Sequence, residues 1–305
     1  MEPACLRHTD LPGTSKLFAD FSYHYDRVAN FYRHDPHDPA SFAAAASEVQ
    51  YPHDRRAAMA RALESQNPGN SLLARFAQPG TLAVVTGQQV GLFSGPAYTI
   101  YKALTAARLA SDLSARGIPA VPIFWLATED HDFAEVDHAW VFDASRQPVC
   151  VRTPGESRPR PAGTVPVARP PIDELRRALA GFDYADEVVS AVEQSYAPGG
   201  TMGVGFRTLL TKLLGRIGVL TMDPLDAGVR AIGAPFMASA LEAGPELEAA
   251  LLARNAELMA AGYHAQVHVD AKTSLFFVLE NGDRVALRQK DSPAAALSPN
   301  ALLRP

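Results

Sequence analysis

The sequence predicts an α/β protein with a parallel sheet, because two short apolar runs flank a helical segment. The runs TLAVVT at 81–86 and VPIFWLAT at 121–128 have the apolar, β-branched composition of buried parallel strands. The segment 96–116 between them carries apolar side chains at the spacing of one helix face: Ile100, Ala103, Leu104 and Ala107. Pro96 fits the first turn of this helix, and Gly117 fits its end. Strand, helix and strand in this order form a βαβ unit.

The segment before the first strand is predicted to be helical. Residues 16–77 contain alanine-rich stretches such as FAAAASEV and DRRAAMARALES, separated by Pro, His, Asp and Gly. We interpret residues 1–80 as an N-terminal helical lead-in and residues 81–143 as the first part of the core.

Residues 144–200 are interpreted as an insertion into that core. The stretch 148–171 contains seven prolines, too many for a central strand or a long helix, at positions 148, 154, 159, 161, 166, 170 and 171. Short edge strands are expected in this segment, and a helical pattern returns at 173–195.

Residues 201–305 are interpreted as the continuation of the core, incomplete at its C-terminus. Helical patterns at 202–216 and at about 235–261 stand on either side of a third core strand at 217–224. Further strands are predicted at 263–269, 274–280 and 284–289, the last two joined by a turn at Asn281-Gly282. The final stretch LSPNALLRP shows neither a helix cap nor a closing strand, so an abrupt end is expected there.

Composition and charge exclude several classes of function. With 47% hydrophobic residues among 305, the chain can bury a sizeable core. The 28 Lys+Arg and 33 Asp+Glu residues give a formal net charge of -5, so nucleic acid and acidic membranes are not expected as partners. Cys5 and Cys150 are the only cysteines, and no run approaches the roughly 20 apolar residues that span a bilayer. We therefore expect a cytoplasmic protein.

The first candidate site is the glycine-rich stretch TGQQVGLFSGP that follows the first strand. Ligands of open α/β sheets bind where the strands end, and glycines let a backbone approach a phosphate or carboxylate closely. The adjacent amides of Gln88 and Gln89 suit recognition of an amide, hydroxyl or sugar. Tyr98 and Lys102 follow in the next helix, and Lys102 could reach an anion. The alternative is a structural turn whose glutamines satisfy buried backbone groups.

The second candidate site is TEDHDFAEVDH, after the second strand. Its acidic groups and imidazoles could bind a substrate ammonium and remove its proton. Alternatively, Asp130, His131 and His138 could hold a metal, although their spacing matches no established metal motif. In a third interpretation, Asp130 or Asp132 caps the next helix and the other side chains face solvent.

A third group of polar side chains lies in YHAQVHV. In a strand, His264, Gln266 and His268 share one face, which either faces solvent or lines a site.

These stretches together resemble a family, the bacillithiol-biosynthesis cysteine-adding enzymes or BshC. The motifs TGQQVGLFSGPAYTIYKA and VPIFWLATEDHDFAEVDH carry the resemblance. It continues through GVLTMDP, GYHAQVHV and LSPNALLRP, and covers about residues 15–305.

The resemblance implies a Rossmann-like core related to class I nucleotidyltransferases, with connective-peptide insertions, and a C-terminal coiled coil that forms a homodimer. It implies a ligase that joins cysteine to glucosaminyl malate through an amide bond, in the last step of bacillithiol biosynthesis. The site residues that it implies are Gly87, Gln88, Gln89, Gly95, Pro96, Glu129, Asp130, His131 and Asp132. Family members continue beyond residue 305, so the coiled coil and part of the core are expected to be missing from this chain.

Amide formation needs an activated carboxylate and a base for the amine. Our hypothesis is that the glycine-rich stretch holds phosphate or carboxylate groups, while Asp130, His131 and Asp132 bind or deprotonate the amine. No metal and no tightly bound cofactor are expected, and ATP or another nucleotide is the candidate activator. Two other classes stay open: a metal-dependent hydrolase that uses residues 129–138, and a non-catalytic module that binds a nucleotide or sugar phosphate.

Overall fold

The computed structural model describes residues 5–156, 158–269 and 275–287. The chain divides into two compact units. The larger comprises Tyr51–Met237 and Phe277–Pro305, and the smaller comprises Met1–Gln50 and Ala238–Phe276. The final stretch LSPNALLRP, where an abrupt end was expected, lies outside the described residues.

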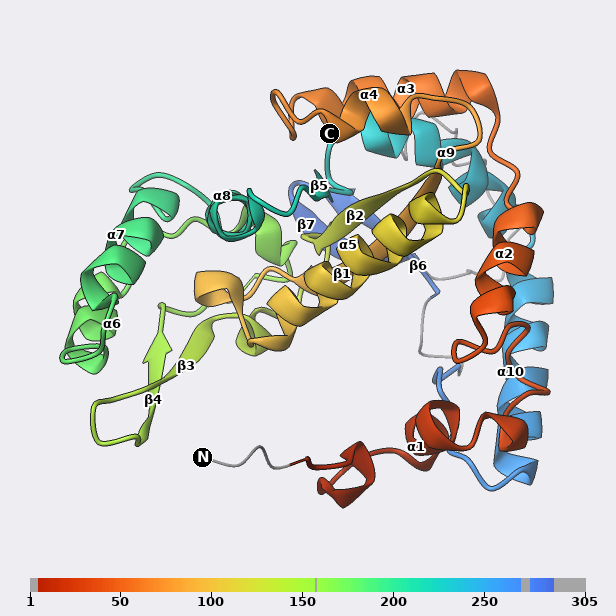
Figure 1. The fold of residues 1–305 in the computed structure, drawn as a ribbon, viewed down its shortest axis with the longest axis horizontal. Helices are drawn as coiled ribbons and strands as arrows, with labels where there is room; N and C mark the ends of the chain where they lie inside the picture. Colours follow the sequence, from red (N-terminus) through yellow and green to blue (C-terminus); the bar gives the residue numbers. More distant parts are fainter. Residues whose placement is uncertain (1–4, 157, 270–274, 288–305) are drawn as a thin grey trace. The chain divides into compact units, whose positions relative to one another are not determined.

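A three-stranded sheet forms the centre of the larger unit (Figure 1). Its strands are β1 (Leu82–Gln89), β2 (Ala120–Ala127) and β5 (Leu220–Met222), in the order β1-β2-β5. Both neighbouring pairs are parallel, with Leu82 opposite Ala120 and Ile123 opposite Leu220. The α/β fold class with a parallel Rossmann-like sheet is therefore confirmed.

Helix α5 (Tyr98–Ala115) connects β1 to β2, as predicted. It ends where Gly117, with φ of 82°, donates to the carbonyl of Ser114 and Ile118 donates to that of Leu113. These two bonds satisfy carbonyls that a helix end leaves free. Pro96 lies before the helix and not in its first turn, because Gly95 and Pro96 still belong to the preceding turn.

The two faces of β2 build two hydrophobic clusters, because side chains alternate along a strand. Phe124 and Leu126 face one cluster, to which α5 and α8 (Met202–Leu214) contribute. Val121 and Ile123 face the other, which α3 (His53–Glu64) and α4 (Leu72–Phe76) cover. Both faces of the sheet are thus buried, which is the arrangement that parallel sheets require.

The segment 144–200 contributes to the same core. Strands β3 (His138–Phe142) and β4 (Pro148–Arg152) form an antiparallel hairpin, followed by α6 (Ile172–Ala178) and α7 (Ala185–Ser195). Residues from this segment join the cluster around Phe124 and Phe206: Val151, Leu175, Val189 and Val192. The helical pattern at 173–195 forms two helices, because Gly181 adopts φ of 89° between them. The segment boundaries stay a prediction.

The end of the described chain forms a second hairpin, from β6 (Phe276–Glu280) and β7 (Asp283–Leu287). Asn281 and Gly282 have φ of 53° and 83°, as the tight turns of hairpins require. The prediction of two strands joined at this dipeptide is confirmed.

The smaller unit contains α1 (Lys16–Tyr23), α2 (Pro39–Glu48) and α10 (Gly244–Ala260). Leu17, Val28, Leu258 and Tyr263 form its buried cluster. Helices α1 and α2, together with α3 and α4 of the larger unit, confirm the helical prediction for 16–77. The single helix predicted at 235–261 is wrong, since α9 (Ala227–Glu242) ends before Gly244-Pro245 starts α10.

The strand predicted at 263–269 is also wrong. The Tyr263 hydroxyl donates to Asp20 Oδ2 at 3.0 Å, and Asn255 Nδ2 donates to the carbonyl of Val267 at 2.6 Å. Asn255 Oδ1 also accepts the N–H of Gln266 at 3.3 Å, so Asn255 takes backbone bonds that a neighbouring strand would make, and the segment is irregular. His264, Gln266 and His268 are exposed there.

No helix in the described part of the chain combines the length and the apolar character needed to cross a membrane.

Candidate functional site

The candidate site lies where the three parallel strands end. Because the strands are parallel and in register, their carboxyl ends meet at one edge of the sheet. Gln88 and Gln89 end β1, Thr128 to Asp132 follow β2, and Asp223 follows β5. Predicted side chains from two distant sequence motifs are therefore brought together.

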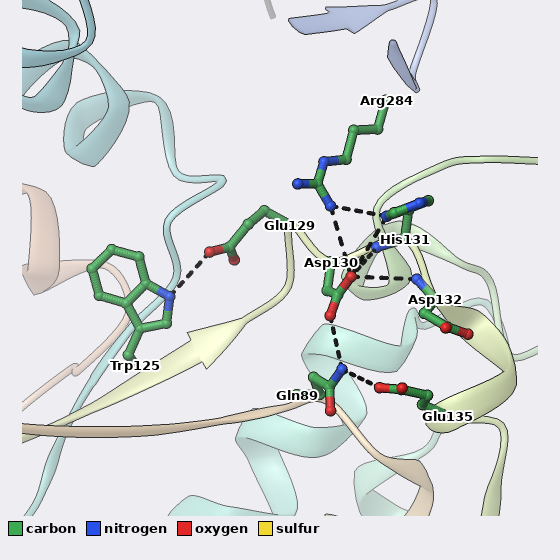
Figure 2. Close-up of polar contacts among 8 residues, drawn as sticks. All are labelled: Gln89, Trp125, Glu129, Asp130, His131, Asp132, Glu135 and Arg284. Atoms are coloured by element: carbon green, nitrogen blue, oxygen red, sulfur yellow. Dashed lines mark hydrogen bonds and ion pairs between the residues drawn. The ribbon is translucent and has the colours of Figure 1, made fainter. Parts of the chain in front are cut away.

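Gln89 joins the two predicted motifs directly (Figure 2). Its Nε2 donates to Asp130 Oδ2 at 2.8 Å and to Glu135 Oε2 at 2.6 Å. The sequence had suggested a loop after Thr86. The structure instead continues strand β1 through Gly87, Gln88 and Gln89. A side chain on Gly87 would meet the Trp125 carbonyl at 2.7 Å, so glycine lets β1 pair with β2 here.

Asp130 accepts hydrogen bonds on both carboxylate oxygens. Besides Gln89, the donors are the backbone N–H groups of His131 at 2.7 Å and Asp132 at 3.4 Å, both to Oδ1. Arg284 Nη1 lies 3.7 Å from the same Oδ1. Burial raises the pKa of this carboxyl, but these donors and the guanidinium outweigh burial, so the pKa falls below its ordinary value. Asp130 is therefore held as a carboxylate.

His131 contacts Arg284, whose guanidinium comes from β7. Arg284 Nη1 lies 2.9 Å from His131 Nδ1 (Figure 2). The Arg284 guanidinium also stacks over the Phe277 ring at 4.0 Å. A guanidinium can only donate, so Nδ1 is the acceptor and the neutral ring carries its proton on Nε2. In this arrangement His131 can offer a hydrogen bond through Nε2 to a ligand.

Gln88 belongs to a separate polar group. Lys102 Nζ donates to Gln88 Oε1 at 2.8 Å and to the carbonyl of Gly87 at 3.4 Å. The same ammonium lies 5.0 Å from the centre of the Tyr98 ring, whose hydroxyl is 3.5 Å from Gln88 Nε2. Helix α5 thus places Tyr98 and Lys102 against the end of β1. The glutamines bind side chains of both candidate motifs, so they do not serve mainly to satisfy buried backbone groups.

The turn after β1 is closed on itself. Phe93, Ser94 and Gly95 have φ of 54°, 74° and 66°, and Gly91 approaches Gly95 so closely that a Cβ would lie 2.9 Å from its Cα. The N–H groups of Gly91, Leu92 and Gly95 donate to protein carbonyls. These amides are used within the protein, so the phosphate cradle expected along this turn is not formed by them.

Tyr196, at the end of α7, supports that turn from the core. It is 2% exposed, its ring meets Phe93 edge to face at 5.3 Å, and its hydroxyl lies 3.4 Å from the carbonyl of Gly91. Burial raises the pKa of this phenol, which stays neutral. The predicted insertion therefore helps to shape the turn beside the site.

Glu129 faces away from Asp130 (Figure 2). Trp125 Nε1 donates to its Oε1 at 3.2 Å, while its buried Oε2 has no partner among the described residues. Burial raises the pKa of this carboxyl, and the negative charges of Asp223 and Asp130 raise it further.

The remaining residues of the second motif lie outside the group formed by Gln89, Asp130 and His131. Asp137, 6% exposed, binds His138 and Arg152 across the β3–β4 hairpin. Asp132 is exposed and makes no side-chain cap, whereas Asp130 accepts the N–H groups of the turn. Within the described ranges no group of three or more Asp, Glu, His or Cys could hold a metal ion. The metal arrangement of Asp130, His131 and His138 is therefore not supported.

Comparison with known proteins identifies the family. Residues 1–302 match the family described as bacillithiol biosynthesis BshC, N-terminal Rossmann-like domain. The chain belongs to the BshC family.

Three BshC relatives illustrate how much of such a protein this chain contains. All bear the name "Putative cysteine ligase BshC". The relative from Solibacter usitatus is 48% identical over 100% of this chain and 61% of its own length. Those from Koribacter versatilis and Salinibacter ruber are 35% and 32% identical over 95% of this chain, and 56% and 59% of their own lengths. The chain thus spans about three fifths of these BshC relatives.

Sequence patterns did not reveal several residues of this candidate site. Asp223 stands near the end of the strand predicted at 217–224, so the rule that ligands bind at strand ends could have found it. Arg284 lies in a hairpin 153 residues from His131, and Tyr196 lies in the insertion, so no local pattern relates either residue to the site.

Proposed function

We propose that this chain carries the Rossmann-like part of a cysteine ligase of bacillithiol biosynthesis, which joins cysteine to glucosaminyl malate through an amide bond. The observation that carries the proposal is membership of the BshC family over residues 1–302. Relatives that match the whole chain or nearly all of it are named cysteine ligases, which supports the same reaction class.

The geometry of the strand ends supports this proposal. Amide formation brings an acyl group and an amine together, so the site must recognise polar and charged groups from both. Gln89 presents an amide at the end of β1, while Asp130 and the ring of His131 present a fixed carboxylate and an N–H donor after β2. Lys102 adds a cation near the end of β1, where a substrate carboxylate could bind.

A carboxylate must be activated before an amine can displace its oxygen. ATP or another nucleotide is the activator that we propose for the complete protein. Because most amides of the turn 91–95 donate within the protein, no step of the reaction is assigned to that turn. We further propose a cytoplasmic location and a homodimer of the complete protein.

The test is mass-spectrometric detection of the amide product from cysteine and glucosaminyl malate, with and without ATP. The 305-residue chain is assayed beside the Solibacter usitatus relative, which controls for the assay. Product from both proteins only with ATP is the expected result. Product from the relative but none from the folded chain would contradict ligase activity in this chain, and ligand binding without turnover would favour a binding module.

A metal-dependent hydrolase is the weaker candidate, since the described residues offer no cluster of metal ligands. Metal analysis of the purified protein checks this directly, because a stoichiometric ion would restore that candidate.

A further inference from the structure

Two polar atoms near the ends of β2 and β5 are buried without a partner. One is Oε2 of Glu129, and the other is Nε2 of Gln66, whose side chain is only 7% exposed. Among the described residues only four buried side-chain atoms lack a hydrogen-bond partner, so two of them near the same strand ends require an explanation.

Gln66 is placed beside Asp223 by the end of α3. Its Oε1 accepts the Asp223 N–H at 2.6 Å, while the next residue, Asn67, exchanges bonds of 2.7 and 2.8 Å with the backbone of Thr221 in β5. The amide nitrogen shares a carbon with Oε1, so it too lies next to Asp223. Because Oε1 already accepts the Asp223 N–H, a 180° rotation that exchanges Oε1 and Nε2 would break that hydrogen bond.

Asp223 is fixed from the other side by β2. Thr128 Oγ1 donates to Asp223 Oδ1 at 2.5 Å, and the N–H of Leu225 donates to the same oxygen at 2.9 Å. Glu129 follows Thr128 directly, and the negative charge of Asp223 helps to raise the pKa of its carboxyl. Glu129, Asp223 and the amide of Gln66 therefore lie around the ends of β2 and β5, and two of these three groups keep a buried atom without a partner.

The charges at this point are not balanced within the described part of the chain. No Lys, Arg or His there forms an ion pair with Glu129 or Asp223, whereas Asp130 has Arg284, Gln89 and two backbone N–H groups. Like charges in a partly buried setting are costly unless a cation joins them. The group that is missing is a cation with several N–H donors.

We propose that the primary ammonium group of a substrate binds between the carboxyl groups of Glu129 and Asp223, beside the amide of Gln66. An ammonium has three donors and no acceptor, so it can meet both carboxyl groups at once. Gln66 Nε2 then donates to an oxygen next to that ammonium in the same molecule. The cluster of Asp130 and His131 is left for other polar groups of the substrates.

This inference deepens the proposed function and rests on it for the choice of ligands. Both proposed substrates carry a primary amine, which is part of the acyl donor in cysteine and the nucleophile in the amino sugar. The probes are L-cysteine and D-glucosamine, compared with 3-mercaptopropionate and D-glucose, which lack the amine. The probe that depends on Glu129 shows which substrate the site accepts.

Calorimetric titration of the 305-residue chain measures the four affinities in the wild type and in Glu129→Gln, Asp223→Asn and Asp130→Asn. Both Glu129→Gln and Asp223→Asn keep the side-chain shape and remove a charge. Loss of a charge-assisted hydrogen bond predicts a decrease of about tenfold or more in affinity for one amine probe. The exposed control Glu187→Gln should change that affinity by less than about threefold, and Asp130→Asn should lower it less than Glu129→Gln does.

Unchanged amine affinity in both Glu129→Gln and Asp223→Asn, with folding verified by circular dichroism, would overturn the proposal. Equal affinity of the wild type for amines and their deaminated counterparts would overturn it as well. A larger loss of amine affinity in Asp130→Asn than in Glu129→Gln would overturn the proposal and place the ammonium site at Asp130 and His131. Calorimetry measures binding without turnover, so it tests the amine site separately from the reaction. If the chain forms no amide product but Glu129→Gln still weakens amine binding, only the proposed reaction is contradicted.

Discussion

At the scale of single residues, Gln89 has the central position in the candidate site. Its amide is the link between the end of β1 and the carboxylates that follow β2. The adjacent Gln88 points to Lys102 instead, as alternation along a strand requires. Two neighbouring glutamines thus serve two different polar groups, which explains why the stretch contains both.

Replacing Gln89 tests this role. In Gln89→Ala, the Asp130 and Glu135 carboxylates lose their shared donor and are free to move, so we expect turnover to fall about 10- to 100-fold. Gln194→Ala is the matched control, because Gln194 contacts Ser190 and Lys212 on the surface. Steady-state kinetics of amide formation measure both variants, and equal rates would contradict the role of Gln89.

Glu129 and Asp130 should affect stability in opposite directions as pH changes. The folded-state pKa of Glu129 is raised, so the free energy of unfolding falls as pH rises from the unfolded to the folded pKa. The pKa of Asp130 is lowered, so its contribution is present above the unfolded pKa and is lost as pH falls through the folded one.

Chemical denaturation near pH 7 and near pH 3 checks these signs. We expect Glu129→Gln to be more stable than the wild type near pH 7, and Asp130→Asn to be less stable. Each difference should be below about 1 kcal/mol, because both groups are partly exposed, and should shrink near pH 3. A destabilised Glu129→Gln at neutral pH would contradict the raised pKa of Glu129.

At the scale of elements, close backbone packing holds the end of β2 in place. Gly163 donates its N–H to the carbonyl of Thr128 at 2.9 Å, and Ala162 donates to that of Asp130 at 2.6 Å. A Cβ on Gly163 would lie 2.4 Å from Thr128 Cβ, and one on Gly203 of α8 would lie 2.9 Å from the carbonyl oxygen of Gly163. The segment predicted as an insertion, the end of β2 and α8 meet here without room for a methyl group.

Gly163→Ala therefore overpacks this junction. We expect it to lower the free energy of unfolding by about 1–3 kcal/mol, since backbone or Thr128 must shift. Gly155→Ala serves as the control, because a Cβ there meets nothing within 4 Å, and a change below about 0.5 kcal/mol is expected. Thermal or denaturant unfolding gives both values, and similar stabilities of the two variants would refute the close packing.

At the scale of the whole molecule, one core joins segments that are distant in sequence. Phe206 of α8 is fully buried, and its ring centre lies 6.3 Å from that of Phe124 in β2. The same cluster contains Val90 after β1 and Val189 of α7. The segment predicted as an insertion is thus joined to the sheet through a shared hydrophobic core.

Phe206→Ala should destabilise that core by about 3–5 kcal/mol, because it removes a fully buried ring and leaves a cavity. Phe182→Ala is its control, since Phe182 is 42% exposed, and a loss below about 1 kcal/mol is expected. Denaturant titration followed by tryptophan fluorescence reports both. A small effect of Phe206→Ala would mean that the segment and the sheet unfold separately.

The sequence by itself determined the sheet, its crossover helix and the two motifs of the site. These features are local: apolar runs define β1 and β2, a 3.6-residue period and Gly117 define α5, and the order of elements makes the strands parallel. The turn at Asn281-Gly282 could also be predicted from the sequence, because such a turn needs residues that tolerate positive φ.

Only the tertiary structure decided which polar groups meet. Arg284 reaches His131 across 153 positions, Gln66 meets Asp223 across 157, and Tyr263 binds Asp20 across 243. Each pairing depends on where the chain returns in space, which local composition does not encode. The failed strand at 263–269 has the same cause, since the side chain of Asn255 bonds backbone groups that a neighbouring strand would have bound. Local propensity sets the elements, and long-range hydrogen bonds and burial decide their partners.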